Sequence, residues 1–292
     1  PYIAPFVTTP IITVAHFVNG IQADNAGYNT DYLNTIIALS NYSKQYLEKE
    51  FKILDTQKVK VVYNFVSDNT QKYNSYKEFS KELTIVFPGG TSVQKSVDVI
   101  LDTVYRLKLS AMNFKFVWLG DTTLPSAKKS LLRIEKTTQL ISTDKRILFT
   151  GKVSREEAMQ YIASANIFLL PSRGEGCPMT LLEAMREGCI PVVSDSHHGS
   201  RELLEISKCG EIVPQGDSEK LYQVIKKIIE NHNEYINCYK KTFEFSKTYL
   251  SQDIWRSKMS EIILDATQKP KKVIKINLIR FYKSMIPYRY RI

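Results

Sequence analysis

From about residue 84 onward, short apolar runs alternate with segments that follow helical patterns. The runs are of strand length and apolar throughout, which is typical of strands buried on both faces. Strands are therefore predicted at residues 84–87, 114–119, 146–150, 167–170 and 190–194, and helices at 93–109, 154–163, 178–187 and 201–206. This alternation predicts an α/β fold in which helices cover both sides of a parallel sheet.

Residues 1–83 show a shorter version of the same pattern. Strands are predicted at 10–16, 34–40 and 59–65, with a helix at 42–50. Three strands make a thin domain, and the polar and aromatic segment 68–83 is predicted to link it to the larger half. A chain of 292 residues has enough length for two cores of ordinary domain size.

Two glutamates flank the start of one predicted helix in the larger half. Glu175 lies in the loop after the strand at 167–170, and Glu183 lies near the second turn of a helix that Pro178 is suited to begin. Ligands of parallel sheets bind beyond the carboxyl ends of the strands, and a helix N-terminus attracts anions. Two acceptors beside an anion site suit a ligand with hydroxyls and phosphates, such as a nucleotide sugar. The plainer alternative is a chance spacing, with Glu183 on a solvated helix face.

The run from Pro171 to Met185 resembles the signature of retaining GT-B glycosyltransferases, particularly glycosyltransferase family 4. That signature places Glu-x7-Glu inside a Pro-Ser-x-x-Glu-Gly…Leu-Glu-Ala-Met stretch, and Pro171-Ser172, Glu175-Gly176 and residues 182–185 match it in order. Further matching segments are 151–157, 161–166, 188–193, Glu202 and 210–216. The resemblance is specific over residues 84–265 and looser over 1–83.

The resemblance implies a GT-B type α/β fold with two Rossmann-like halves and parallel sheets, of which the N-terminal half is incomplete. Residues 1–83 would be the partial, acceptor-side domain, residues 84–265 the nucleotide-sugar-binding domain, and residues 266–292 a basic amphipathic tail. The implied enzyme is a metal-independent, retaining hexosyltransferase that needs no cofactor. It would move a sugar from a nucleoside-diphosphate sugar to a glycan or lipid-linked acceptor in cell-surface polysaccharide biosynthesis. A nucleotide-sugar epimerase and a non-catalytic nucleotide-sugar-binding protein are the alternatives.

The same resemblance implies roles for single residues. Glu175 would contact the hydroxyls of the donor sugar, Lys95 would neutralise the departing diphosphate, and His16, at the end of a predicted strand, would face the transferred sugar. Glu183 would hold the ribose hydroxyls. The remaining donor-binding positions are Gly90, Gly151, Lys152, Val153, Gly176, Met179, Thr180 and Leu181. Among these, the loop 151–153 would cover the base, and the amides of 179–181 would bind the diphosphate. The plainer alternative for Lys95 is a solvent-facing helix lysine.

Two positions of the phosphate-binding segment depart from the family pattern, as do Phe65 and Ser67 beside Asn64. Gly90 stands where the family has an arginine, and Ser96 replaces a glycine. Loss of a cation at the leaving phosphate should raise the reaction barrier, which leaves Arg173 and Arg201 as candidate substitutes. Asn64 matches a family motif that shapes the entry to the hinge, so a structural role is expected.

The pair His197-His198 is not expected to bind a metal. Adjacent side chains rarely converge on one ion, and no spaced carboxylate set accompanies them. We expect this loop, through Gly199 and Glu202, to line the donor pocket. The chain also has no Gly-x-Gly-x-x-Gly, which counts against a nicotinamide-dependent dehydrogenase.

The net charge of +10 is concentrated in residues 269–292, which hold eight basic residues and no acidic one. On a helical wheel the apolar residues of this tail share one face, which favours an anionic membrane surface as a partner. Nucleic acid is not expected, because the basic residues cluster only here. The alternative is a C-terminal helix that packs back across the hinge, as in GT-B proteins; packing to about residue 265 and membrane contact beyond are compatible.

The remaining features predict a cytoplasmic protein that is peripheral, if membrane-bound, on the inner face of the membrane. No apolar run approaches the roughly 20 residues that span a bilayer, and no signal peptide is visible. The four cysteines, at positions 177, 189, 209 and 238, show no metal-type spacing and are expected to be reduced thiols. Cys177 is expected to be a neutral residue of the site loop.

Overall fold

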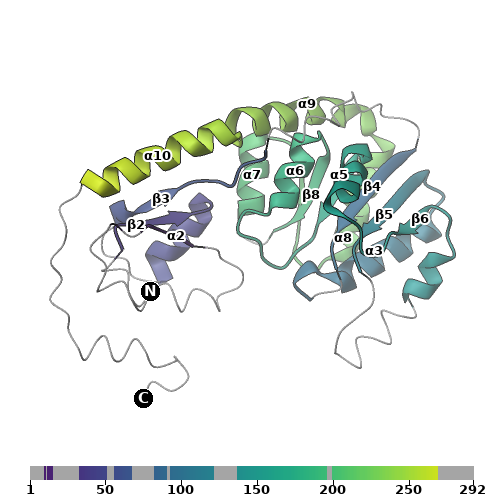
Figure 1. Ribbon diagram of the computed structural model, residues 1–292. Helices are drawn as coiled ribbons and strands as arrows, with labels where there is room; N and C mark the ends of the chain where they lie inside the picture. The colour runs from purple at the N-terminus through teal and green to yellow at the C-terminus, as the bar shows by residue number, and fades with distance from the viewer. Residues whose placement is uncertain are drawn as a thin grey trace, which may run out of the picture.

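The computed structural model shows two α/β halves, each built on a parallel sheet (Figure 1). The structure describes residues 10, 12–15, 33–50, 56–67, 82–90, 93–121, 137–195 and 199–268. His16, His197, His198 and the tail 269–292 lie outside these residues.

The larger half contains a parallel sheet of six strands. They are β4 (Leu83–Pro88), β5 (Phe114–Leu119), β6 (Ile147–Phe149), β7 (Ile167–Leu170), β8 (Ile190–Ser194) and β9 (Glu211–Val213). Their order across the sheet is β6-β5-β4-β7-β8-β9. Strands β5 and β6 therefore lie on one side of β4, whereas β7, β8 and β9 follow one another on the other side. The direction in which strands are added reverses between β4 and β7. In doubly wound sheets, ligands bind at such a reversal, beyond the carboxyl ends of the two central strands.

Alternate residues of these strands supply the two cores that lie on opposite faces of the sheet. Ile85 and Phe87 of β4 belong to the core that contains α3 (Val97–Leu109) and α8 (Ser218–Glu230), whereas Val86 belongs to the other core. The second core contains α5 (Arg155–Ser164), α6 (Met179–Arg186) and α7 (Gly199–Ser207). Burial on both faces explains why the strands read as continuous apolar runs.

Three of the predicted strands, 114–119, 167–170 and 190–194, agree with β5, β7 and β8 at both ends. The segment predicted as one helix at 93–109 is a 3-10 turn, η5 (Val93–Lys95), followed by α3. Beyond residue 206 the alternating pattern gave no strand or helix with defined bounds, although a C-terminal helix that packs back across the hinge was expected as an alternative to membrane contact; the structure has β9, α8, α9 (His232–Tyr249) and α10 (Gln252–Gln268) there.

In the described residues the smaller half has three parallel strands in the order β1-β2-β3: Ile12–Ala15, Thr35–Ala38 and Val59–Val61. A 3-10 turn, η3 (Thr56–Lys58), precedes β3, and α2 (Asn41–Glu50) follows β2. Leu47 of α2 packs with Ile36 and Ala38 in one core of this half. On the opposite side, Ile262 of α10 packs with Ile37 and Val62, joined by Trp255 and Met259.

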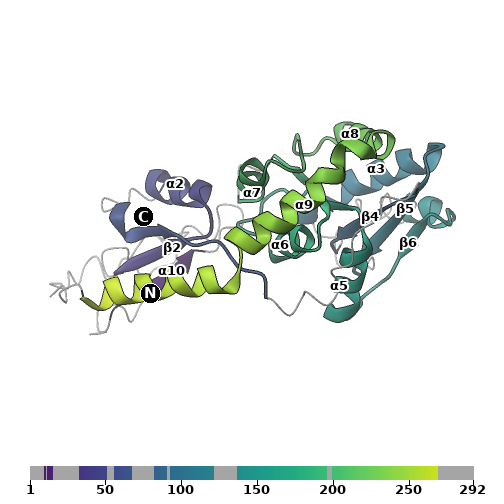
Figure 2. The same ribbon diagram turned by 90° about the horizontal axis from the view of Figure 1, so that it is seen from above.

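Helix α10 thus belongs by packing to the smaller half, although it ends the described chain. Figures 1 and 2 show α9 running along the larger half and α10 continuing over the smaller sheet. The crossing is fixed where the amide of Val66 donates to the carbonyl of Leu250 at 2.9 Å and the Phe65 ring lies 5.0 Å from that of Trp255. This is the return across the hinge that the sequence offered for the C-terminal helix.

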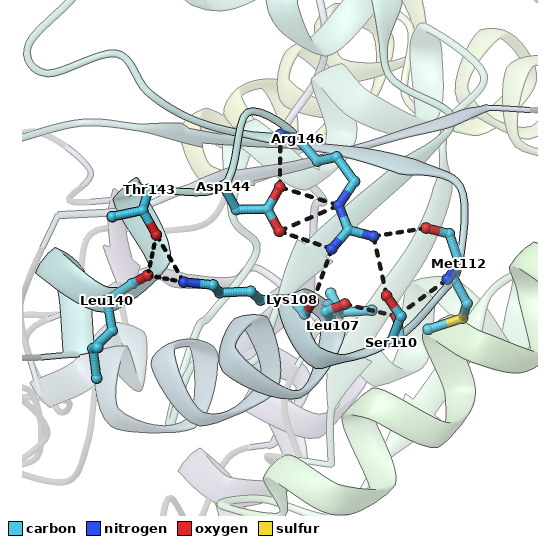
Figure 3. A network of polar contacts seen from close by, with 8 residues as sticks. All are labelled: Leu107, Lys108, Ser110, Met112, Leu140, Thr143, Asp144 and Arg146. Atoms are coloured by element: carbon cyan, nitrogen blue, oxygen red, sulfur yellow. Dashed lines mark hydrogen bonds and ion pairs between the residues drawn. The ribbon is translucent and has the colours of Figure 1, made fainter.

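An arginine ties the start of β6 to the end of α3 (Figure 3). Arg146 donates to the carbonyls of Lys108, Ser110 and Met112 at 2.8, 3.2 and 2.9 Å. Asp144 holds the guanidinium by hydrogen bonds of 2.7 to 3.2 Å, which lower the pKa of the Asp144 carboxyl. The network satisfies carbonyls that the end of a helix leaves without intrahelical partners.

The expectation of four reduced thiols is wrong for two of them. Cys209 and Cys238 form a disulfide, with Cα atoms 5.3 Å apart. The two cysteines are 29 residues apart, and their spacing did not predict the disulfide. Cys209, just before β9, meets Cys238 only when α9 packs beside the sheet. Cys177 and Cys189 are free and buried. Within the described ranges, no helix combines the length and the apolar character needed to cross a membrane.

Candidate functional site

The reversal of strand order brings Lys95 and Glu175 together. Lys95 ends the 3-10 turn after β4, and Glu175 lies in the loop after β7. The Lys95 Nζ lies 2.6 Å from the Glu175 Oε1, and the side chains are 26% and 12% exposed. Two of the predicted catalytic residues, 80 positions apart in the chain, therefore form an ion pair at the place where this type of sheet binds ligands.

Backbone contacts fix the two loops against each other. The amide of Arg173 donates to the carbonyl of Gln94 at 2.8 Å, and the Gln94 side chain donates to the carbonyl of Gly174 at 3.0 Å. The last residue of β8, Ser194, donates its hydroxyl to the Ser172 carbonyl, and Gln215, in the loop after β9, donates its side-chain amide to the Arg173 carbonyl. The loop that carries Glu175 is thus held from both sides.

Helix N-termini converge on the same loop. Helix α6 begins at Met179, directly after it, and Pro178 at its start makes no side-chain cap. The Leu181 amide donates to the Pro178 carbonyl at 3.1 Å, so the amides of Met179 and Thr180 are those of the first turn without an intrahelical acceptor. Helix α7 begins at Gly199, where an added Cβ would lie 2.0 Å from the Gly176 carbonyl oxygen. Both dipoles favour negative charge near Gly176.

Glu183 lies in α6, almost enclosed, and pairs with one cation among the described residues. Its side chain is 7% exposed, and its Oε1 lies 2.5 Å from the Nη2 of Arg155, whose side chain is 79% exposed. Burial raises the pKa of the Glu183 carboxyl, and the charge of Arg155 opposes that rise. In the sequence, the one signal for Arg155 is its place beside the predicted loop 151–153.

Glycines connect the loops that follow β4, β5 and β6. The Gly120 amide donates to the Gly151 carbonyl at 3.1 Å, and the indole of Trp118 donates to the Gly89 carbonyl at 2.7 Å. Gly120 has a φ of +128°, and an added Cβ would meet the Gly89 carbonyl oxygen at 3.0 Å. Around Gly90 the nearest atom to an added Cβ is the Asp121 carbonyl oxygen, at 4.0 Å. The predicted donor-binding positions Gly90 and Gly151 are therefore brought close to each other, with Lys152 exposed beside them.

Glu202 lies on α7 but turns toward the smaller half. Its carboxylate accepts hydrogen bonds from the amides of Asn41 and Tyr42, each 3.0 Å long, from the Asn41 side chain at 2.7 Å, and from the Tyr63 hydroxyl. Burial and this hydrogen bond raise the pKa of Tyr63. The carboxylate therefore caps α2 from the other half of the molecule, rather than lining a donor pocket as expected. We refer to these four residues as the Glu202 clamp.

Asn64 also joins the two halves at the site. Its side-chain amide donates to the Cys177 carbonyl at 2.8 Å, so the predicted structural role acts directly on the loop that carries Glu175. Burial raises the pKa of the Cys177 thiol to about 12, which keeps it protonated and agrees with the expected neutral role.

The two candidate substitute arginines are held by carboxylates. Arg173 lies 2.8 Å from Asp98 in the first turn of α3, close to Lys95 in the chain. Arg201 pairs with Asp195 at 2.6 Å and Glu205 at 2.7 Å, and these hydrogen bonds raise its pKa. Across the described part of the chain, no group of three or more His, Cys, Asp or Glu residues is arranged to hold a metal ion.

Comparison with known proteins identifies the family to which this part of the chain belongs. Residues 82–231, about half of the chain, match the family described as glycosyl transferases group 1. The amylovoran biosynthesis glycosyltransferase AmsK of Erwinia amylovora is 27% identical over 179 residues, covering 58% of this chain and 42% of that protein. WcaL of Salmonella typhimurium, named for a proposed role as a colanic acid biosynthesis glycosyltransferase, is 28% identical over 155 residues, covering 51% and 36%. The chain thus spans less than half the length of these relatives.

Solved structures share the fold at low sequence identity. HepE of Anabaena, crystallised with UDP, gives a TM-score of 0.73 at 17% identity, over 87% of this chain and 72% of that one. The lipopolysaccharide outer core galactosyltransferase WaaB gives 0.62 at 21% identity, over 80% and 62%. These likenesses confirm the predicted α/β fold of GT-B type with parallel sheets.

Proposed function

Since the chain belongs to the glycosyl transferases of group 1, we propose that it moves a sugar from a nucleoside-diphosphate sugar to a glycan or lipid-linked acceptor, with retention at the anomeric carbon. Assembly of a cell-surface polysaccharide is the proposed setting. The names of the amylovoran and colanic acid relatives support that setting, and the UDP bound to HepE supports a nucleotide donor.

The observation that carries the proposal is the Lys95–Glu175 pair. It places a cation and an acceptor 2.6 Å apart at the reversal of strand order, beside the first turn of α6. A diphosphate needs cations and free amides, whereas a sugar needs acceptors for its hydroxyls. Lys95 and the amides of Met179 and Thr180 would meet the first requirement, and Glu175 would meet the second.

The donor is proposed to lie along this edge of the sheet. Its diphosphate would take the amides of Met179 and Thr180 together with the ammonium of Lys95, which has three N–H donors and can serve Glu175 as well. Glu175 would then face the hydroxyls of the sugar. Glu183 would accept the ribose hydroxyls, and the loop 151–153 would cover the base.

Charge on the departing phosphate is the main demand of the reaction, because the bond to the sugar breaks toward it. Lys95 and the α6 dipole would stabilise that charge without a metal ion. The leaving phosphate would in turn assist the incoming acceptor hydroxyl on the same face of the sugar, which gives retention. The acceptor would approach from the carboxyl ends of β1–β3, where His16 follows Ala15 in the sequence.

Isothermal titration with UDP-glucose, ADP-glucose and GDP-mannose tests donor binding. We expect one of these sugars to bind, and Glu183→Ala to weaken that binding by about 1–3 kcal/mol, because hydroxyls are left without an acceptor. Glu219→Ala is the control, since Glu219 is a half-exposed carboxylate that pairs with Arg106 on the helix layer of the opposite face. Unchanged affinity in Glu183→Ala would contradict the assignment.

Turnover separates the enzyme from a binding protein. Release of the nucleoside diphosphate is measured with and without oligosaccharide acceptors, and the anomeric configuration of the product is read from its proton NMR coupling. Retention of the donor configuration is expected. Tight binding without turnover under any acceptor would favour a non-catalytic nucleotide-sugar-binding protein instead.

A further inference from the structure

The contact between Arg155 and Glu183 bears directly on donor binding. Glu183 is nearly enclosed, and an isolated carboxylate at such a position is costly to keep charged. Its Oε1 is held at 2.5 Å by Arg155, while its Oε2 makes no hydrogen bond to any residue that the structure describes. One oxygen is therefore fixed by a cation, and the other is left as an acceptor.

The backbone of Arg155 is held in place although its guanidinium is exposed. It is the first residue of α5, and the preceding Ser154 forms a capping box with Glu157: the Ser154 hydroxyl accepts from the Glu157 amide at 3.2 Å, and the Ser154 amide donates to the Glu157 side chain at 2.8 Å. A capping box fixes the direction of the first turn. The guanidinium therefore reaches Glu183 from the first turn of α5, whose direction is fixed and which follows the loop 151–153.

We propose that Arg155 is a positioning residue for the donor: it keeps the Glu183 carboxylate ionised and oriented through Oε1, so that Oε2 accepts a hydroxyl of the nucleotide sugar. The inference rests on the proposed function, since it names the residue through which the donor-binding carboxylate is prepared. An ionised acceptor binds a hydroxyl more strongly than a neutral one. An exposed ion pair would contribute little by itself, so the contribution comes from the enclosed partner.

Three variants test the role of Arg155 by titration with UDP-glucose, ADP-glucose and GDP-mannose. Arg155→Met keeps the length and the apolar part of the side chain but removes the charge, and we expect it to weaken donor binding about tenfold. Arg155→Lys restores a cation and is expected to recover most of that affinity. Arg106→Met is the matched control, because Arg106 pairs with the half-exposed Glu219 away from the site; its affinity should equal that of the wild type.

A double-mutant cycle shows whether Arg155 acts through Glu183. If it does, Arg155→Met made in a Glu183→Gln background changes the affinity by no more than about twofold, although each single variant is weaker than wild type. Additive losses would overturn the proposal, because they would mean that Arg155 contacts the donor independently.

Other outcomes of these titrations also test the proposal. Equal or tighter binding by Arg155→Met would overturn the proposal, and tighter binding would mean that Arg155 competes with the donor for Glu183. Failure of Arg155→Lys to recover affinity would overturn it as well. If the wild type binds none of the three sugars, the proposed function fails and this inference with it, whereas normal wild-type binding with an unaffected Arg155→Met leaves the proposed function intact.

Discussion

Ser96, next to Lys95, adopts a backbone conformation that suits glycine. Its φ and ψ are 52° and 47°, in the left-handed region, and its buried hydroxyl makes no hydrogen bond to any residue of the described ranges. We expect Ser96→Gly to stabilise the protein by roughly 1 kcal/mol, because relief of the left-handed strain and removal of the buried hydroxyl outweigh the greater freedom of glycine in the unfolded chain. Thermal and urea unfolding measure the change.

Two other variants separate the causes of that change. Ser96→Ala removes the hydroxyl but keeps the strained backbone, and Lys208→Gly relieves a similar φ of 51° at an exposed position. Each should give only part of the gain. A loss of stability in Ser96→Gly would show that the αL conformation costs this serine nothing.

At the residue scale, Glu175, Glu183 and Lys95 each carry a local signature of a loop and a helix start, whereas the contacts that they make depend on the fold. Arg155 carries no such signature, because an arginine in the first turn of a helix is usually solvated. Glu202 matched the family pattern, but a glutamate within a helix is also usually solvated, and nothing near it in the sequence indicated its partner. The role of Glu202 depends on Asn41, which is 161 residues away in the chain.

The start of α7 is the element whose position the site depends on most. At Gly199 an added Cβ would lie 2.0 Å from the Gly176 carbonyl oxygen and 3.3 Å from the Cβ of Ser40. Because neither backbone can yield without moving a loop, we expect Gly199→Ala to cost about 1–3 kcal/mol of stability, as overpacking does. Displacement of the Gly176 loop should also weaken donor binding, which titration measures.

The neighbouring Ser200 supplies the control for Gly199→Ala. Its buried hydroxyl makes no hydrogen bond within the part of the chain that the structure describes, so Ser200→Ala removes an atom from the same turn without adding one. Stability and donor affinity close to those of the wild type are expected. If Gly199→Ala behaves like Ser200→Ala, then the close approach between α7 and the site loop is not required.

At the element scale, prediction succeeded where burial on both faces made the pattern continuous. Strands β5, β7 and β8 were predicted to the residue, whereas β9 has three residues and half-buried positions, which is too little for a pattern. Strand order could not be predicted from the pattern, because it depends on which crossovers pack together. The site at the reversal between β4 and β7 therefore becomes visible only in the folded sheet.

At the scale of the whole molecule, the smaller half relies on α10, which follows the larger half in the sequence. Its three-stranded sheet is covered on one side by α2, while the other side is covered by α10, through Ile262, Trp255 and Met259. Because α10 follows α9 of the larger half directly in the chain, this connection links the two halves in addition to the polar contacts. The Glu202 clamp and the Asn64 contact act beside the site, and α10 acts at the hinge.

The Glu202 clamp should control how firmly the smaller half is held. Glu202→Gln keeps the shape of the side chain but replaces one acceptor oxygen by an amide group, which cannot accept from the Tyr42 amide or the Asn41 donors. We expect a loss of about 1–3 kcal/mol in local stability, because partly buried hydrogen bonds lose a charged acceptor. Faster hydrogen exchange in α2 measures that loss, and Glu234→Gln, an exposed position on α9, is the control. Donor affinity should change little, because Lys95 and Glu183 belong to the larger half, whereas turnover should fall as the acceptor side loosens. If exchange in α2 and turnover both match the wild type, the Glu202 clamp is not needed to hold the smaller half.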